Sequence, residues 1–380
     1  MEKEFFNYAA YIAATGWERR TFFSRWQSIY QNDRRWAPPP YRRLTQMLTP
    51  DRSPHLARRT PQLIHMEAVE RRTTNNSTLA AGLGASGILR EQAVCAAILL
   101  TDPRSRERTG ALAYLHTVND PAVVERFLWT LQEQSYRLGI RRLVAPVGLS
   151  SFLPSGALMD NFHRPPPLHT IYNPPYVPEI LSLAMSPVSE SRLYTAHVSS
   201  SGPGAGDACI SVPPAQMTAT LGPLSAAIAD QEGNDDEAIF PSPDAAEIAF
   251  YYDWLRVWPM EIWVYQTGGE NAGFIILQPD LAPAMAQAQG GRRPWQRAWL
   301  AWRMRRPVDA GRIVLGGVQP AYRRQGIGAR LWMHALNRAA AHGWRTLTVG
   351  PVTDESSGAS FLREVGATPQ QRYVLFGADL

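Results

Sequence analysis

One stretch of the chain, residues 311–343, limits the possible folds more than any other. It starts with an apolar run at 313–318, which has the length and composition of one buried strand. Pro320 ends that strand, because proline donates no hydrogen bond to a sheet. A turn with two glycines follows, and then apolar residues at helical spacing that stop at Gly343. The order predicts a strand, a turn, a helix and a second strand, with glycines where the helix begins.

The turn, Arg323-Arg324-Gln325-Gly326-Ile327-Gly328, has the composition of an anion-binding site. Gly326 and Gly328 have no side chains, so a ligand can approach the backbone closely. The first N–H groups of the following helix have no intrahelical partner, and the helix dipole adds partial positive charge there. Together with the two arginines, these groups predict binding of a phosphorylated ligand, above all a pyrophosphate.

The turn has two other interpretations. One is a glycine-softened connection from strand to helix with solvated arginines. The other is a dinucleotide-binding turn, which fits less well because three spaced glycines and an acidic residue about 20 positions later are missing.

The turn resembles the acyl-CoA signature of the GNAT superfamily of N-acetyltransferases, Gln/Arg-x-x-Gly-x-Gly/Ala. Arg323 takes the first position, Gly326 the first glycine and Gly328 the last. The segments FFSRWQSIYQNDRRWAPPP, RPPPLHTIYNPPYVPEILSLA and PAYRRQGIGARL together resemble a bacterial group with two GNAT-like halves, of which the N-terminal one is degenerate. The resemblance implies an α/β (α+β) fold of tandem GNAT-like domains, each with a mixed, mostly antiparallel central sheet flanked by helices.

The order of the chain favours the same division. Residues 1–198 are predicted as the degenerate GNAT-like domain, 199–242 as a Gly/Ser/Pro-rich linker, and 243–380 as the acyl-CoA-binding GNAT domain. The first half also contains a strand, a helix, a glycine and a strand in that order, with Gly139 as the glycine. The turn before its helix has neither a glycine pair nor an arginine, so this half is expected to lack the anion site.

Length and composition favour a cytoplasmic protein of two domains without a membrane span. The chain has 380 residues and no run of eighteen apolar residues, and its acidic N-terminus does not resemble a signal peptide. Cys95 and Cys209, the two cysteines, suggest core thiols in a reducing compartment. The net charge of +5 is spread along the chain, so nucleic acid is not expected as a partner, and no Cys/His spacing predicts a metal site.

The resemblance also implies which residues hold the co-substrate, acetyl-CoA or another acyl-CoA. In GNAT enzymes the strand before the glycine turn separates from the next strand and grips the pantetheine, and Leu315, Gly316, Gly317 and Val318 match it here. A backbone N–H near Val318 is expected to polarise the thioester carbonyl. The remaining cofactor-binding positions follow the turn: Arg323, Arg324, Gln325, Gly326, Ile327, Gly328 and Ala329.

The acid and the base depart from the family's pattern. The tyrosine that many members carry four residues before the glycine of the final helix falls on Leu362, and the asparagine that opens this helix falls on Glu355. Asp354 and Glu355 follow the second strand and are candidate bases, or else they cap the helix after Ser356. Tyr373 is the candidate substitute for the missing tyrosine.

These features predict an acyl-CoA-dependent N-acyltransferase. It is expected to move acetyl from acetyl-CoA to a primary amine of a small molecule, by direct attack in a ternary complex. A catalytically silent acyl-CoA-binding or structural protein is one alternative, and a module that binds an anionic partner through its arginines is another. The halves are expected to form a pseudo-dimer within a monomer, or a homodimer, with the acceptor pocket between the halves.

A Trp- and Arg-rich helix is expected at 294–305, before the glycine turn. Helical spacing places Trp295, Trp299 and Trp302 on one face. Such a face can line an acceptor pocket, contact a membrane surface or pack on the domain.

Overall fold

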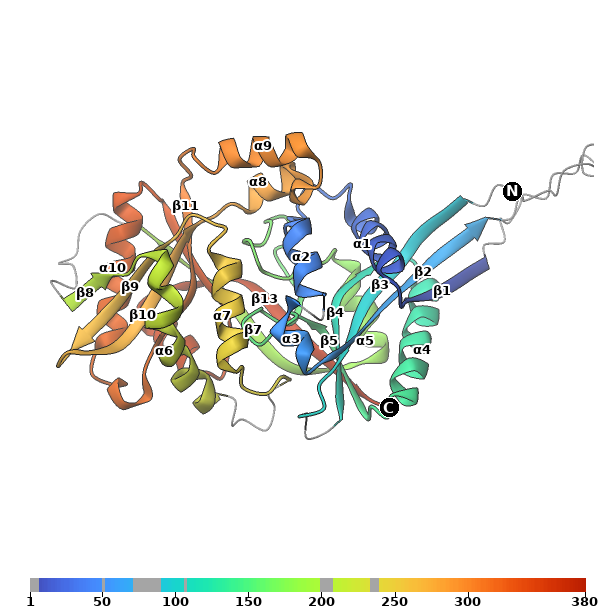
Figure 1. Cartoon of the computed structure of the whole chain (residues 1–380), viewed down its shortest axis with the longest axis horizontal. Coiled ribbons are helices and arrows are strands. Elements are labelled where there is room, and N and C mark those ends of the chain that lie inside the picture. Colours follow the sequence, from blue (N-terminus) through green and yellow to red (C-terminus); the bar gives the residue numbers. More distant parts are fainter. Residues whose placement is uncertain (1–6, 50–51, 71–89, 106–107, 199–207, 233–238) are drawn as a thin grey trace, which may run out of the picture.

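The computed structural model describes residues 7–49, 52–70, 90–105, 108–198, 208–232 and 239–380. The first half begins with a strand and helices that cover the following strands (Figure 1). Its elements are, in order, β1 (Asn7–Ala13), α1 (Gly16–Tyr30), α2 (Tyr41–Met47), α3 (Pro54–Ala57), β2 (Thr60–Glu70), β3 (Arg90–Thr101), β4 (Thr109–Thr117), α4 (Pro121–Arg137), β5 (Arg142–Val147), β6 (Ala157–Leu158), α5 (Tyr176–Ala184) and β7 (Ser186–His197).

The second half contains a similar series of elements, with an additional helical segment before its fourth strand. They are β8 (Cys209–Ser211), η3 (Pro214–Gln216), α6 (Met217–Glu232), α7 (Ala245–Leu255), β9 (Glu261–Thr267), β10 (Glu270–Pro279), α8 (Ala282–Gln287), η4 (Gln289–Gly291), α9 (Pro294–Arg303), β11 (Ala310–Val318), η5 (Pro320–Tyr322), α10 (Ile327–Ala341), β12 (Thr346–Thr353), α11 (Ser357–Glu364) and β13 (Thr368–Asp379).

Part of the segment that composition predicts as a linker is folded. Within 199–242, residues 209–211 form β8, which pairs with β9, and 217–232 form α6. Met217, Leu221 and Leu224 of α6 are buried in a core with α7. The sequence of α6 has small residues and an internal proline, so it shows no clear helical pattern of apolar residues. Burial of one face, rather than intrinsic helix propensity, stabilises this helix. Residues 199–207, the first part of the predicted linker, lie outside the described residues.

All strands of the described residues lie in one sheet. Their order is β1-β2-β3-β4-β5-β13-β7-β12-β11-β10-β9-β8, with β6 also beside β13. Only the pairs β4–β5 and β11–β12 are parallel, and the other pairs are antiparallel. The predicted mixed, mostly antiparallel α/β architecture is therefore confirmed.

The two faces of this sheet have different cores. On one face, α1 of the first half and α6 and α7 of the second half share a single hydrophobic cluster, which contains Phe22, Trp26, Leu221 and Tyr252. On the other face, α4 and α5 cover one cluster, and α10 and α11 cover a separate one. The halves are therefore continuous on one face and distinct on the other.

The last strands of the two halves are exchanged. β13, which ends the second half, pairs with β5 of the first half. β7, which ends the first half, pairs with β12 of the second half. Between these pairs, β7 and β13 are antiparallel to each other over most of their length, from Thr368↔Thr195 to Gly377↔Ser186. Each half therefore depends on the other for the strand beside its own parallel pair.

A buried ion network also joins the halves. Arg59, which follows α3, places its Nε 3.0 Å from Oδ2 of Asp102 and its Nη2 3.4 Å from Oε1 of Glu247 on α7. All three side chains are almost completely buried. Removing one partner of such a network leaves an uncompensated buried charge, so it ties the register of α7 to the first half.

Cutting the covalent connection between the halves should not separate them. We expect that a protease site placed within 199–207 and then cleaved yields two fragments that elute together in native buffer. The fragment that ends in the first half carries β7, and the other carries β12 and β13, so the central ladders span the cut. Size-exclusion chromatography of cut and uncut protein tests this, with denaturant as the control that releases the fragments. Separate elution in native buffer contradicts it.

Candidate functional site

The parallel strands β11 and β12 pair over a short distance and then separate. Their ladder stops at Ile313↔Val349. Beyond this point β11 continues to Val318 along β10, and β12 continues to Thr353 along β7. A bulge at the same point leaves Val314 without an opposite residue on β10. A gap therefore opens between the two strands toward their carboxyl ends.

The backbone of β11 is accessible from this gap. Residues 315–318, which include the four positions predicted to hold a pantetheine, pair with β10 on one edge and have no strand partner among the described residues on the other. They are at least partly exposed, whereas 311–313, before the gap, are buried. Alternate residues of an antiparallel ladder direct their N–H and C=O groups away from the partner strand. Backbone donors and acceptors of this segment therefore face the gap.

Beyond the end of β11, α10 begins with uncapped N–H groups. Gly326 is its N-cap residue, in the left-handed region at φ 76°, and no side chain caps the helix. Arg324, two residues earlier, is also left-handed at φ 61°. The N–H of Arg330 reaches the carbonyl oxygen of Gly326 at 3.1 Å, which starts the intrahelical bonds. The N–H groups of 327–329 precede that bond and can bind an anion.

The side chains of the turn leave room for a ligand. Arg323, Arg324 and Gln325 are exposed. A Cβ at Gly326 would meet no atom within 4 Å, and one at Gly328 would lie 3.7 Å from Phe361, an ordinary contact. Neither glycine is therefore required by packing inside the protein. At Gly326 the positive φ requires glycine, and at Gly328 open backbone is consistent with a ligand that approaches closely.

The corresponding region of the first half is closed. β4 and β5 remain paired to Ala113↔Val147, past the point at which the second pair separates. The N-terminus of α4 is capped by its own carboxylate, because Oδ1 of Asp120 accepts from the N–H groups of Ala122 at 3.1 Å and Val123 at 3.3 Å. A carboxylate in this position satisfies the free donors and repels an anion.

Aromatic side chains bind three further backbone groups of β4. Trp26 donates its Nε1–H to the carbonyl oxygen of Tyr114 at 2.9 Å. The hydroxyl of Tyr30 accepts from the N–H of Thr117 at 3.3 Å. The hydroxyl of Tyr176 donates to the carbonyl oxygen of Thr117 at 2.6 Å. The first half thus satisfies internally the groups that the second half leaves open.

A buried arginine lies where β11 and β12 separate. Arg312 donates from Nη2 to the carbonyl oxygen of Gly350 at 2.6 Å, at the base of the gap. Its Nη1 donates to the carbonyl oxygen of Leu168 and to Oγ1 of Thr170, the latter at 3.3 Å. Both acceptors belong to the first half. The sequence prediction started the strand at Ile313, three residues after the start of β11, and so missed Arg312. Its signal was an arginine next to an apolar run, where a buried charge needs several partners.

Two further titratable groups are close to this arginine. Burial raises the pKa of Asp280, although Arg312 opposes the shift. Burial and the charge of Arg312 together lower the pKa of His169 well below its usual value, so this imidazole is neutral near pH 7. Its ring lies 4.1 Å from that of Trp254, and its buried Nε2 has no hydrogen-bond partner among the described residues. The sequence prediction did not include either group.

Comparison with known proteins assigns the second half to a family. Residues 227–366 match the model of the acetyltransferase (GNAT) family. The similarity to that family lies in the second half of the chain. The match covers the gap, the glycine turn and α10, and the GNAT family implies an acyl-CoA co-substrate.

Similar structures cover almost the whole chain. A tandem GNAT protein from the clavulanic acid biosynthesis pathway has 11% sequence identity and a TM-score of 0.57, with 98% of both chains covered. A GCN5-related N-acetyltransferase from Sphaerobacter thermophilus has 11% identity and a TM-score of 0.50, over 98% of this chain and 95% of that one. At such identities the likeness shows the fold, and the tandem GNAT architecture predicted from the sequence is confirmed.

A sequence relative has a more specific name. The bacterial ceramide synthase of Caulobacter vibrioides is 27% identical over 121 residues, which are 30% of this chain. The aligned part is 32% of that protein, so the chain matches about a third of its relative's length.

The residues of the GNAT half fit an acyl-CoA. The open edge of 315–318 offers backbone donors and acceptors to an extended pantetheine, and the uncapped start of α10 offers N–H groups to a pyrophosphate. Arg323 and Arg324 add exposed positive charge beside that helix.

The two candidate bases lie at the mouth of the gap. Asp354 follows β12, five residues after the last pair with β11, which is about 16 Å along an extended strand. Its Oδ2 accepts from Nε of Arg192 at 2.7 Å, and its buried Oδ1 has no partner among the described residues. Glu355 is exposed. Ser356 itself caps α11, by accepting from the N–H of Ala359 at 3.2 Å, so neither acid serves as the cap.

The candidate general acid is inaccessible to a substrate in this structure. Tyr373 is fully buried between Leu158 and Leu193, and its hydroxyl lies 3.3 Å from Oε1 of Gln371. Burial raises the pKa of Tyr373 far above its usual value. Leu362, at the family's tyrosine position, is buried in the core beneath α11.

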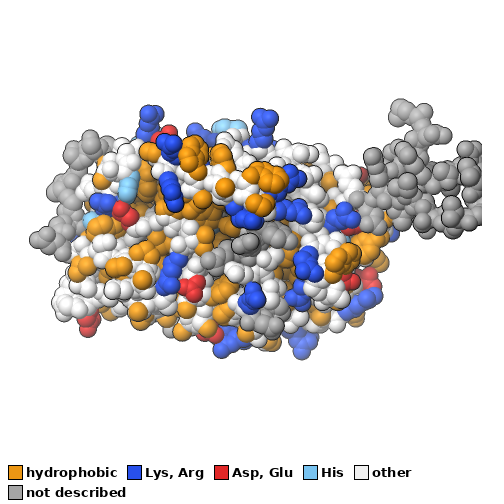
Figure 2. Space-filling model, turned by 45° about the horizontal axis from the view of Figure 1, so that its top comes forward, with side chains coloured by type: hydrophobic (Ala, Val, Ile, Leu, Met, Phe, Trp, Pro, Cys, Tyr) orange, Lys and Arg blue, Asp and Glu red, His pale blue; other side chains and the backbone are white. Residues whose placement is uncertain are grey.

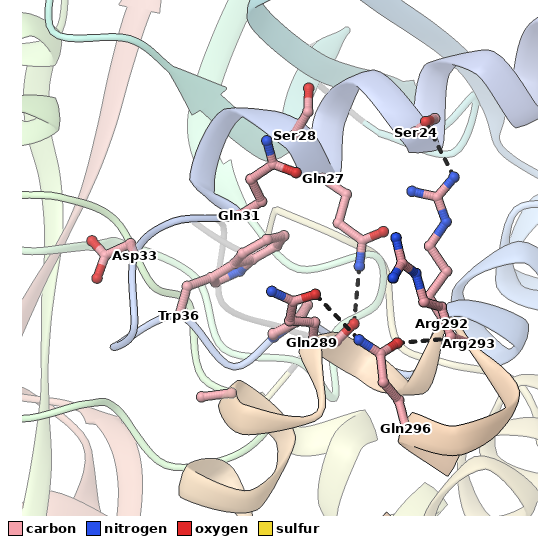
Figure 3. Close-up of a pocket in the computed structure, with 12 residues that line it drawn as sticks. Ser24, Gln27, Ser28, Gln31, Asp33, Trp36, Gln289, Arg292, Arg293 and Gln296 are labelled. Carbon is pink, nitrogen blue, oxygen red and sulfur yellow. Dashed lines mark hydrogen bonds between the residues drawn. The ribbon is translucent and has the colours of Figure 1, made fainter.

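A separate cavity of about 360 Å³ lies between the halves. Figure 3 shows α1 and the turn after it on one side and the segment from α8 to α9 on the other. The amide of Gln27 donates to the carbonyl oxygen of Gln289 at 3.3 Å, and Arg292 donates to Oγ of Ser24 at 3.3 Å, so the two halves are bonded across it. Its remaining lining is mostly polar: Ser28, Gln31, Asp33, Trp36, Pro38, Ala286, Arg293 and Gln296.

The described residues contain neither a membrane-spanning helix nor a cluster of metal ligands. No helix there is long and apolar enough to cross a membrane, and no group of three or more His, Cys, Asp or Glu side chains is placed to hold a metal ion.

Binding of CoA tests the glycine turn. We expect one site per chain by calorimetry, and we expect Gly326→Asp to weaken binding on the order of 100-fold or more, because it puts a carboxylate at the anion site. Gly343→Asp is the matched control, since this glycine is also left-handed, at φ 73°, with open space around it, but lies at the other end of α10. Equal affinity of the two variants, or two sites per chain, contradicts the assignment.

Proposed function

We propose that the chain is an acyl-CoA-dependent N-acyltransferase with one co-substrate site, in the gap between β11 and β12. The observation that carries the proposal is the coincidence of two open features, the unpaired edge of β11 and the uncapped N-terminus of α10. The corresponding features of the first half are both occupied by its own side chains. A structural strand-to-helix turn would need neither feature.

Each part of the gap has a role in this proposal. Bound acyl-CoA would supply an activated thioester carbonyl. The backbone of 315–318 would hold the pantetheine, and an N–H near Val318 would polarise the carbonyl. The N–H groups at the start of α10, with Arg323 and Arg324, would hold the phosphates.

The proposed reaction is the transfer of acetyl to a primary amine of a small molecule, by direct attack in a ternary complex. The amine loses a proton as the amide bond forms, and the departing thiolate gains one. We place the acceptor at the interface of the halves. Arg312 at the base of the gap bonds there to Leu168 and Thr170 of the first half, so both halves border this region.

Asp354 and Glu355 are the proposed bases. Both lie at the mouth of the gap, so a water molecule has to relay the proton from an amine bound deeper. Oδ1 of Asp354, which has no hydrogen-bond partner among the described residues, would accept from such a water. Tyr373 keeps its place as a proposed acid only if the protein opens around it, because its hydroxyl is buried.

A longer acyl chain is the second candidate for the transferred group. The observation that favours it is the likeness to a protein named a bacterial ceramide synthase, a name that denotes formation of an N-acylated lipid. A catalytically silent acyl-CoA-binding protein is the remaining alternative, and turnover separates it from both.

A panel of acyl-CoAs tests the reaction and the acyl group together. We expect thiol release from acetyl-CoA that depends on added small primary amines, because the gap presents a thioester to an acceptor at the interface. Turnover with long-chain acyl-CoAs alone corrects the acyl group to the longer candidate. Binding without turnover across the panel establishes the silent alternative.

Substitution of the two acids tests the base. We expect Glu355→Gln or Asp354→Asn to lower kcat on the order of 100-fold, the usual scale for a general base, with unchanged CoA affinity. Because Asp354 also pairs with Arg192, Arg192→Gln is the control that breaks the pair and keeps the carboxylate. The acidic limb of the pH profile should disappear only in the variant that has lost the base.

Two other results for the acid variants would contradict the proposed base. Full activity in both acid variants rejects them as bases and directs attention to His169, whose neutral imidazole lies near the base of the gap. Loss of CoA binding in either variant means that the acid is structural.

A further inference from the structure

The helix α9 presents an apolar face to solvent. A surface helix of a globular protein usually turns its apolar stripe inward and its polar side outward. Leu300 of α9 does face the core, but Trp295 is 61% exposed and Trp302 is 52% exposed. Ala298, on the same face of the helix between these tryptophans, is exposed as well. Of the three tryptophans that the sequence places on one face, only Trp299 packs partly on the domain.

Arginines surround this face. Residues 290–307 contain six arginines and no acidic residue. The guanidinium carbon of Arg293 lies 5.0 Å from the ring centre of Trp295, and that of Arg306 lies 4.8 Å from the ring centre of Trp302. We call residues 292–306 the Trp–Arg ridge. Figure 2, in which the top of the molecule comes forward, shows blue and orange side chains side by side along this part of the surface.

Four arginines of the ridge have no carboxylate partner among the described residues. Within the part of the chain that the structure describes, no carboxylate forms an ion pair with Arg293, Arg303, Arg305 or Arg306. The ridge is also not needed for the repeated fold, because in the first half the corresponding strands, β3 and β4, are connected by residues 102–108 alone. Its composition therefore has to be explained by something other than folding.

An exposed tryptophan elsewhere provides a contrast. Trp129 on α4 is 64% exposed, but its helix carries acids and arginines together, and Arg137 pairs there with Glu133. A single exposed aromatic side chain on a surface of mixed charge is ordinary. The ridge differs because it combines two exposed indoles with four arginines that pair with no carboxylate of the described residues.

We propose that the Trp–Arg ridge docks the protein on the surface of an anionic membrane. Indole rings are favourable at the boundary between headgroups and acyl chains, and arginines bind the phosphates of anionic lipids. A helix with tryptophan on its apolar face and arginine beside it lies in that boundary and does not span the bilayer. Duplex nucleic acid would use the arginines but would leave the indoles exposed, so the membrane explains more of the surface. This docking goes beyond the proposed transfer reaction and does not depend on it.

Flotation with vesicles tests the proposal. The probes are vesicles of phosphatidylcholine alone and vesicles with about 30% phosphatidylglycerol. We expect the full chain to bind the anionic vesicles on the order of tenfold more tightly than the neutral ones, and to release them as NaCl rises from about 0.1 M to about 0.5 M. Trp295→Ser with Trp302→Ser should weaken binding on the order of tenfold, because the apolar contact is lost.

Matched variants separate the two contributions. Arg305→Gln with Arg306→Gln should weaken binding and flatten its salt dependence, whereas Trp129→Ser should bind as the unmodified protein does. Unchanged melting temperatures show that the variants are folded. Failure of the unmodified protein to bind anionic vesicles overturns the proposal, and so does a double tryptophan variant that binds normally. Binding of duplex DNA without binding of vesicles also overturns it and identifies nucleic acid as the partner.

Discussion

The antiparallel pairing of β7 with β13 is the constraint on which the rest of the structure depends. It places a strand of the opposite half beside each parallel pair. The parallel pair separates in the second half and stays together in the first. β12 stays on β7 as far as Thr353, so it can leave β11 and still have its backbone bonded. β5 leaves β13 at Ala145 and instead follows β4 to Val147, while β6 takes over the edge of β13. The gap is open in one half because its second strand is held from the other side.

The closed half shows what an open backbone requires. Buried N–H and C=O groups need partners, and the first half supplies them from Trp26, Tyr30 and Tyr176 and from the carboxylate of Asp120. In the second half no side chain of the described residues caps the start of α10, and residues 315–318 are at least partly exposed. Exposed donors in water cost little in the absence of a ligand, so this half can keep a binding site without losing stability.

The sequence predicted the elements around the proposed site whose formation depends on local chemistry. The glycine turn, the strand before it and the absence of a second turn are all visible in residues that lie next to one another, and the tandem fold follows from the resemblance they support. Arg312 and His169 could not be predicted in this way, because their positions depend on a loop of the first half reaching β11. The exchanged strands and the helix α6 were missed for the same reason: pairing and burial between distant segments hold them in place.

The segment from α8 to α9 shows how a repeated fold gains a new surface. It lies between β10 and β11, the two strands that support the gap from one side, and Leu281, Met285 and Leu300 anchor it in a core with Trp258. The ridge is therefore rigidly connected to the site, and Arg292 and Gln289 also bond to α1 of the first half. A surface fixed to both halves gives the whole sheet one orientation on whatever it contacts. β11 begins after the ridge and also forms one wall of the gap. The fold therefore determines the direction from which an acceptor reaches the gap when the ridge contacts a surface.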